Sequence, residues 1–166
     1  IRTKRWWTLT MQVLLTFGMA GIAFLLPLHF FFQATPAVFW VMAFSSATHD
    51  IAADGFYMLA LNKHDQSLFV GIRSTFYRAA MIVGQGPLVI LAGWLETHSQ
   101  WFVKMLSSSP LKGLVNASVG DLSQKGAGGG GVAGAWSLTF WLLTALFLFC
   151  VLYHKWALPK PYSDNE

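Results

Sequence analysis

The stretch WSLTFWLLTALFLFCVLYHKW, residues 136–156, decides the fold of this chain. It is almost uninterrupted apolar sequence, and a helix needs about 20 such residues to cross the hydrocarbon core of a bilayer. Tryptophans stand at both of its ends, which is typical of a membrane interface. The whole chain agrees, since 55% of its 166 residues are hydrophobic and 11% are charged, against about a quarter charged in an average soluble domain. These values indicate an integral membrane protein.

Three further stretches are long enough to span a membrane: residues 7–28, 36–61 and 67–95. The first of them is clearly apolar, whereas charged residues interrupt the second and the third. We therefore predict an all-α fold, a polytopic bundle of four transmembrane helices. Residues 62–66 form the turn between the second and third spans. The loop 96–135 is expected to begin with a short helix on the membrane surface and to continue as a Gly-rich linker.

Basic residues predict the orientation of these spans. They precede the first span, occupy the turn and follow the fourth span: Arg2, Lys4, Arg5, Lys63, Lys155 and Lys160. Because short basic flanks stay in the cytoplasm, we expect residues 1–6, the turn and residues 157–166 on the cytoplasmic side. The loop 96–135 then lies outside. No basic run is interleaved with exposed aromatic residues, so nucleic acid is not an expected partner.

Ionisable residues interrupt the second and third spans at matching depths. Asp50 and Asp54 are four residues apart, so they share one face of a helix. The next span carries Arg73 and Arg78. Counted from the turn at about 1.5 Å per residue, Asp54 and Arg73 both lie at a depth of roughly 10 Å, and Asp50 and Arg78 at roughly 16 Å. This arrangement predicts two ion pairs, Asp54–Arg73 and Asp50–Arg78.

Two interpretations of these charges remain open. They form a structural ladder that pins two helices together, or they mark a proton and substrate pathway, as intramembrane charges often do. For Asp50 and Arg78 we favour the pathway, and for Asp54 and Arg73 the two interpretations weigh equally. His49, which can titrate near neutral pH, is a further pathway candidate, although a satisfied interior histidine is the simpler interpretation.

A metal site or an enzyme is not expected. His49 and Asp50 are neighbours that point apart on a helix, and no other histidine or cysteine joins them at the spacing of metal ligands. An intramembrane enzyme would need such a metal or an activated nucleophile, and the sequence offers neither. We predict no cofactor.

Small residues and a proline interrupt the third span. Gly84, Gly86 and Pro87, with the polar Gln85 between the glycines, either bring a neighbouring helix close or kink the helix for gating. Helix packing is the favoured interpretation. Near the end of the fourth span, His154 is expected at the membrane interface.

Two segments resemble a known transporter family. SSATHDIAADGFYM, residues 45–58, resembles the fourth transmembrane helix of AmpG-like permeases, and GIRSTFYRAAMIVGQGPLVILAGW, residues 71–94, resembles their fifth. These permeases belong to the major facilitator superfamily, in the branch that also holds acetyl-coenzyme A transporters. RTKRWW, residues 2–7, resembles the end of the basic loop that precedes the third helix of that superfamily.

The resemblance implies helices three to six of a twelve-helix transporter, so the chain is expected to be a piece of a longer protein. It implies a permease of the bacterial inner membrane that imports muropeptides or other small anionic solutes with protons. The expected partners are the lipid bilayer, the solute, protons and the remaining helices. Two features depart from the family: His49 replaces an amide, and the Gly-rich outer loop is long. The alternative is a non-transporting scaffold or sensor whose ion pairs are structural.

Overall fold

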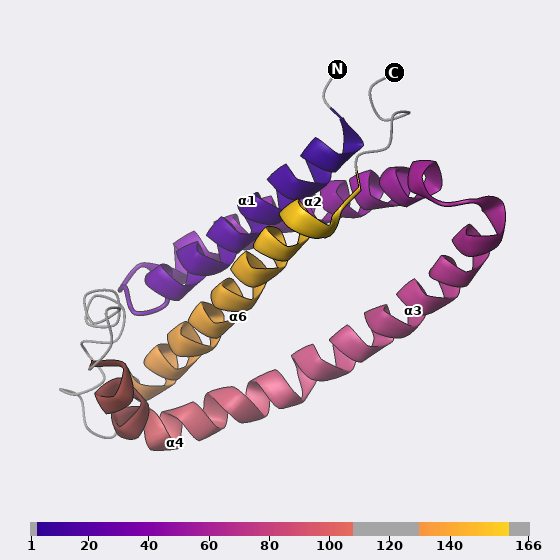
Figure 1. The fold of residues 1–166 in the computed structure, drawn as a ribbon. Helices are drawn as coiled ribbons and strands as arrows, with labels where there is room; N and C mark the ends of the chain where they lie inside the picture. Colours follow the sequence, from indigo (N-terminus) through magenta and orange to yellow (C-terminus); the bar gives the residue numbers. More distant parts are fainter. Residues whose placement is uncertain (1–2, 108–129, 160–166) are drawn as a thin grey trace.

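The structure, a computed structural model, describes residues 3–107 and 130–159, and every element in these ranges is an α-helix. The helices are α1 (Lys4–Leu25), α2 (Phe31–Ala60), α3 (Lys63–Gln85), α4 (Pro87–Ser107) and α6 (Gly130–Ala157). The all-α class is therefore confirmed. Figure 1 shows α1 and α6 side by side with α2 against α1, while α3 and α4 leave this group and return to it at the start of α6.

Three helical stretches are long and apolar enough to cross a membrane: Lys4–Leu25, Lys63–His98 and Gly131–Ala157. They correspond to the first, third and fourth predicted spans. α2 has the length, with 30 residues, or about 45 Å of helix. It is not among the three because hydroxyl, imidazole and carboxylate groups dilute the apolar character of its second half.

Local signals explain where the helices around the α2–α3 turn begin and end. The Asn62 side chain accepts a hydrogen bond from the backbone N–H of Asp65 at 2.9 Å, a standard N-cap. The Gln66 amide donates to the carbonyls of Met58 and Leu61, at 3.1 and 2.9 Å, and so ties the new helix to the end of α2. α3 consequently begins at Lys63, inside the segment predicted as a turn.

The core lies where α1, α2 and α6 meet. Leu15 and Ile22 of α1 are buried with Met42 of α2. Partly buried apolar side chains of all three helices surround them: Met19, Leu26, Val38, Phe140 and Phe147. Ser137 of α6 is fully buried, and its hydroxyl donates to the carbonyl of Ala23 in α1 at 2.6 Å. Apolar packing and interhelical hydrogen bonds, including this one, therefore hold α6 against α1.

The third predicted span is two helices rather than one. α3 ends at Gln85 and α4 begins at Pro87, where a proline is tolerated because the first helical N–H needs no intrahelical partner. Gly86 between them has φ −110° and ψ −81°. α4 then continues through a non-helical residue, His98, to Ser107, so it enters the segment predicted as the outer loop.

The other end of that predicted loop is helical as well. α6 begins at Gly130, several residues before the expected start at residue 136. Here α6 packs on α4 through small residues: Ala92 and Ala135 are buried, and Gly131 faces the side chain of Glu96. Small side chains let two helices approach closely, so these Gly and Ala residues act as packing positions and not as a linker. The remaining Gly-rich residues, up to 129, lie outside the described residues.

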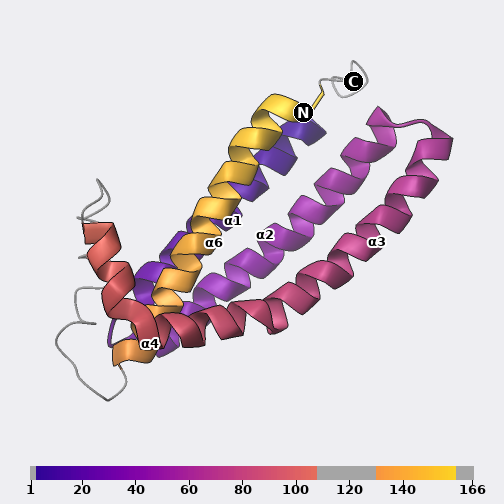
Figure 2. The same ribbon diagram turned by 60° about the horizontal axis from the view of Figure 1, so that its bottom comes forward.

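α3 differs from the other helices because none of its residues is buried. It joins α2 at the turn and then stands clear of α2 in the view of Figure 1, while the view of Figure 2 shows the two helices with nearly parallel axes. Its exposed apolar side chains include Leu68, Phe76, Tyr77 and Ile82. No other described helix covers its apolar surface.

Candidate functional site

The predicted pair closest to the turn is formed. Nη1 of Arg73 in α3 donates to Oδ1 of Asp54 in α2. The two side chains are 48% and 40% exposed, so the pair lies on the open side of the α2–α3 turn and not in the core. The depth argument therefore identified partners correctly where the two helices are still close together.

The deeper predicted pair is not formed. Within residues 3–107 and 130–159, no ion pair joins Asp50 to Arg78, and both residues are exposed. The prediction of an Asp50–Arg78 pair is wrong for this structure because α2 and α3 diverge with distance from the turn (Figure 1). Equal depth along two helices brings side chains together only where the helices run side by side. Asp50 instead has a histidine beside it, with its Oδ1 3.8 Å from Nδ1 of His49.

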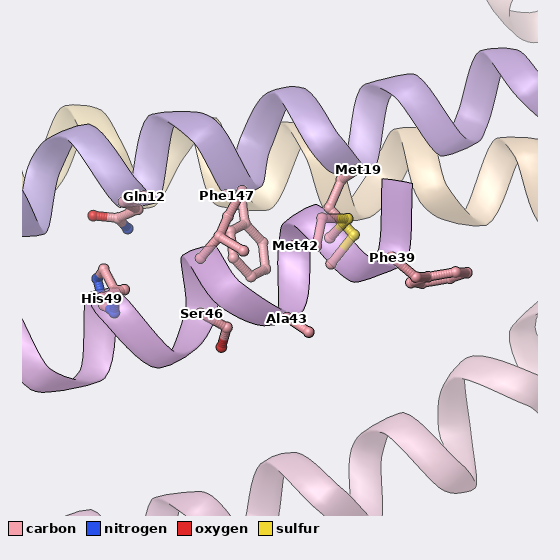
Figure 3. A pocket seen from close by; sticks show the side chains of 9 residues that line it. Gln12, Met19, Phe39, Met42, Ala43, Ser46, His49 and Phe147 are labelled. Atoms are coloured by element: carbon pink, nitrogen blue, oxygen red, sulfur yellow. The ribbon is translucent and has the colours of Figure 1, made fainter. Parts of the chain in front are cut away.

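His49 lies at one end of a cavity between α1, α2 and α6 (Figure 3). The cavity has a volume of about 470 Å³. Its wall is mostly apolar, and the polar side chains of Gln12 and His49 lie at one end (Figure 3). The lining residues are Gln12, Leu15, Met19, Phe39, Met42, Ala43, Ser46, His49 and Phe147. A mainly apolar cavity with a few polar groups is the usual form of a small-molecule site.

Gln12 connects this end of the cavity to α6. Its side chain is buried, only 5% exposed, and its Oε1 lies 2.9 Å from Nδ1 of His154. An amide oxygen only accepts hydrogen bonds, so Nδ1 of His154 is the donor and carries the proton. Gln12 also faces His49 (Figure 3). Nε2 of His49 is buried and has no hydrogen-bond partner within the described ranges.

Sequence reasoning missed Gln12 and the contact that His154 makes with it. His154 is partly buried near the end of α6, where an interfacial position was expected, and its ring is bonded to α1. A signal for Gln12 was present, because an amide in an otherwise apolar span needs a partner there. The partner lies 142 positions away, and no local pattern identifies it.

The Gly-Pro segment, residues 84–87, interrupts the helix backbone and makes no close contact with another described helix. A Cβ added at Gly84 would meet no atom within 4 Å, and one at Gly86 would approach only the carbonyl of Ile82, at 3.3 Å. Gln85 and Pro87 are exposed. Among the described residues, these positions contribute a break between α3 and α4 instead of a close interhelical contact.

In the described part of the chain, no three or more His, Cys, Asp or Glu side chains lie close enough together to hold a metal ion.

The site thus consists of one interhelical ion pair, two separated charges and a cavity whose polar end joins three helices. Comparisons with protein-family models, curated proteins and solved structures find no match. The resemblance to AmpG-like permeases therefore stays a prediction.

Proposed function

We propose that this chain is part of a secondary active transporter of the bacterial inner membrane, one that imports small anionic solutes with protons. Muropeptide-like molecules are the first solute class to test. The observation that carries the proposal is the pair of charges left apart, Asp50 and Arg78. Both lie well inside long helices. If these helices span a membrane, an ionisable group there is energetically costly and usually has a functional role.

The distribution of charge supports a pathway over a purely structural ladder. A ladder would close both ion pairs, because removing one partner from a low-dielectric region leaves an unpaired charge. Here Asp54 and Arg73 are joined, whereas Asp50 and Arg78 are not. In the proposal, the guanidinium of Arg78 attracts the carboxylate of a solute, and Asp50 with its neighbour His49 binds the proton. Arg73 is a second anion-binding candidate, and Asp54 a second proton carrier.

The shape of α3 and α4 supports alternating access. Transporters often use broken membrane helices, whose halves can move separately. The break at Gly86 and Pro87 divides the Lys63–His98 stretch into two such halves, and α3 has no buried residue that would hold it in place. Rocking of α3 about this break would change the separation of Arg78 and Asp50.

The test is uptake by the full-length protein in membrane vesicles. A labelled muropeptide is followed with and without an inward proton gradient, for the wild type, for Asp50→Asn and for Arg78→Gln. Asp65→Asn is the matched control, since Asp65 is an acid in the first turn of α3, at the end of the helix and away from Asp50 and Arg78 along the chain. We expect gradient-driven uptake that is lost in the two pathway variants and kept in the control.

One observation favours the alternative, a scaffold or sensor. The Asp54–Arg73 pair ties α2 to α3 near their turn, which a packing role alone would explain. That alternative predicts a protein that folds normally and keeps its function with Asp50→Asn and Arg78→Gln combined. Uptake that persists in this double variant would remove the coupling role of both residues.

A further inference from the structure

We infer that Gln12 joins His49 and His154 into one proton-binding unit at the polar end of the cavity. The three residues come from α1, α2 and α6. This inference deepens the proposed transport function and rests on it for the use of the proton. The hydrogen-bonded unit itself can be measured without transport.

One half of the unit is already formed. Nδ1 of His154 donates to Oε1 of Gln12 at 2.9 Å. This leaves the amide nitrogen of Gln12 with two N–H groups to donate, and among the described residues it has no acceptor. Gln12 as a residue is only 5% exposed, so little solvent reaches this side chain.

The other half requires an acceptor, and His49 supplies one. In Figure 3 the imidazole of His49 lies opposite Gln12, at the end of the cavity. Nε2 of His49 is buried without a hydrogen-bond partner in the described ranges. Nδ1, on the other side of the ring, lies 3.8 Å from the Asp50 carboxylate, which favours a proton on Nδ1 and a free lone pair on Nε2. The inferred hydrogen bond from the Gln12 amide nitrogen to Nε2 would give this buried ring nitrogen the partner that it lacks.

Proton binding at His49 reverses the direction of the hydrogen bonds that run from His154 through Gln12 to His49. The proton adds to the lone pair of Nε2, which becomes a donor and can no longer accept from the Gln12 amide. If the amide turns over, its oxygen accepts from His49 and its nitrogen donates to Nδ1 of His154. His154 then releases its Nδ1 proton to water and takes one at Nε2, with no net change. One proton is gained in total, at His49. The change reaches α6 through Gln12 of α1, because the proton of His154 moves from Nδ1 to Nε2.

The charged groups around His49 are compatible with this role. Asp50, on the same helix, has its Oδ1 3.8 Å from Nδ1 of the ring. From α6 the facing group is His154. On α1, the side-chain carbons of Lys4 lie against Gly55 of α2, further toward the turn. Asp54 is held by Arg73.

The experiment is a double-mutant cycle on the titration of His49. The full-length protein, with ¹⁵N-labelled histidine rings, is placed in lipid nanodiscs, and ring ¹⁵N shifts are followed against pH. In the wild-type background, His154→Asn is expected to change the midpoint of the His49 titration by roughly half a pH unit, the equivalent of about one hydrogen bond. With Gln12→Met, the same replacement is expected to leave the midpoint unchanged.

Two controls separate the link from other effects. His98→Asn removes a histidine at the kink of α4 and should leave the His49 midpoint unchanged in both backgrounds. Gln33→Met removes an exposed amide and should leave the link between the two histidines intact. The helical circular dichroism of each variant is recorded, because Gln12→Met must fold to enter the cycle.

Two results would overturn the inference. In the first, His154→Asn leaves the His49 midpoint unchanged in the wild-type background, which decides the question even if Gln12→Met fails to fold. In the second, His154→Asn changes the midpoint equally in both backgrounds, so the two rings interact through space and not through Gln12. If the cycle shows that Gln12 couples the two histidines but the protein does not take up solute, only the transport proposal is refuted. If the protein takes up solute but the cycle shows no coupling, only this inference is refuted.

Discussion

Replacement of Gly18 by alanine tests the packing of α1 on α2, the contact that forms one wall of the cavity. A Cβ at Gly18 would lie 2.5 Å from Cγ and 2.8 Å from Sδ of Met42. Met42 is itself buried, at 7% exposure, in the core with Leu15 and Ile22. The added methyl group therefore forces Met42 out of its position or α2 away from α1. Gly21, one turn further along α1, has no atom within 4 Å of the same added Cβ.

The two glycines make a matched pair from which the magnitude follows. Alanine is favoured over glycine inside a helix by roughly 0.5–1 kcal/mol, and both variants gain this term. Overpacking a tight core typically costs about 1–3 kcal/mol, and only Gly18→Ala carries this cost. The free energy of unfolding of Gly18→Ala should therefore lie about 1–3 kcal/mol below that of Gly21→Ala.

The assay is unfolding by sodium dodecyl sulfate in mixed micelles, followed by circular dichroism. Combination of Gly18→Ala with Met42→Ala removes the clash, so the penalty for the alanine at position 18 should disappear in the Met42→Ala background. Equal unfolding curves for Gly18→Ala and Gly21→Ala would refute the close α1–α2 contact. The same conclusion would follow if Met42→Ala left the Gly18→Ala penalty intact.

Three further predictions use the same assay. Asp54→Arg and Arg73→Asp should each lower the midpoint of unfolding because each breaks the α2–α3 ion pair, and the swapped double variant should recover; a double variant no better than the singles would contradict the pairing. Arg78→Gln should leave the midpoint unchanged while Arg73→Gln lowers it, since no ion pair of Arg78 occurs among the described residues. Ser137→Ala should reduce the free energy of unfolding by about 0.5–1.5 kcal/mol, because it removes the buried hydrogen bond to the carbonyl of Ala23; an unchanged value would show that this bond contributes nothing.

The helices themselves could be predicted in large part. Apolar runs predicted helical spans that overlap α1, α2 and α6, whereas the third span was predicted as one helix and a kink at the Gly-Pro pair was only the second interpretation. The loop before α6 was predicted too long at both ends. Glycine and alanine there look like a linker in the sequence, but they are small residues at the contact between α4 and α6.

The candidate site could be predicted only near the turn. Asp54 and Arg73 are close because a short turn fixes the register of the helices that carry them. The same reasoning failed for Asp50 and Arg78, because the angle between two helices is set by what packs on their other faces. α2 packs against α1, and α3 has no buried residue. That difference in packing cannot be read from either helix alone.

The sequence by itself determined the all-helical architecture of this chain, the presence of helices long and apolar enough to cross a membrane, and the ionisable residues that interrupt the apolar runs. These follow from hydropathy and charge, which are properties of single residues and their near neighbours. Only the tertiary structure decided which polar groups meet. The placement of α6 against α1 brings His154 to Gln12, and the placement of α2 against α1 brings His49 to the same cavity. Such contacts depend on the relative orientation of helices far apart in the chain, and side-chain packing sets that orientation.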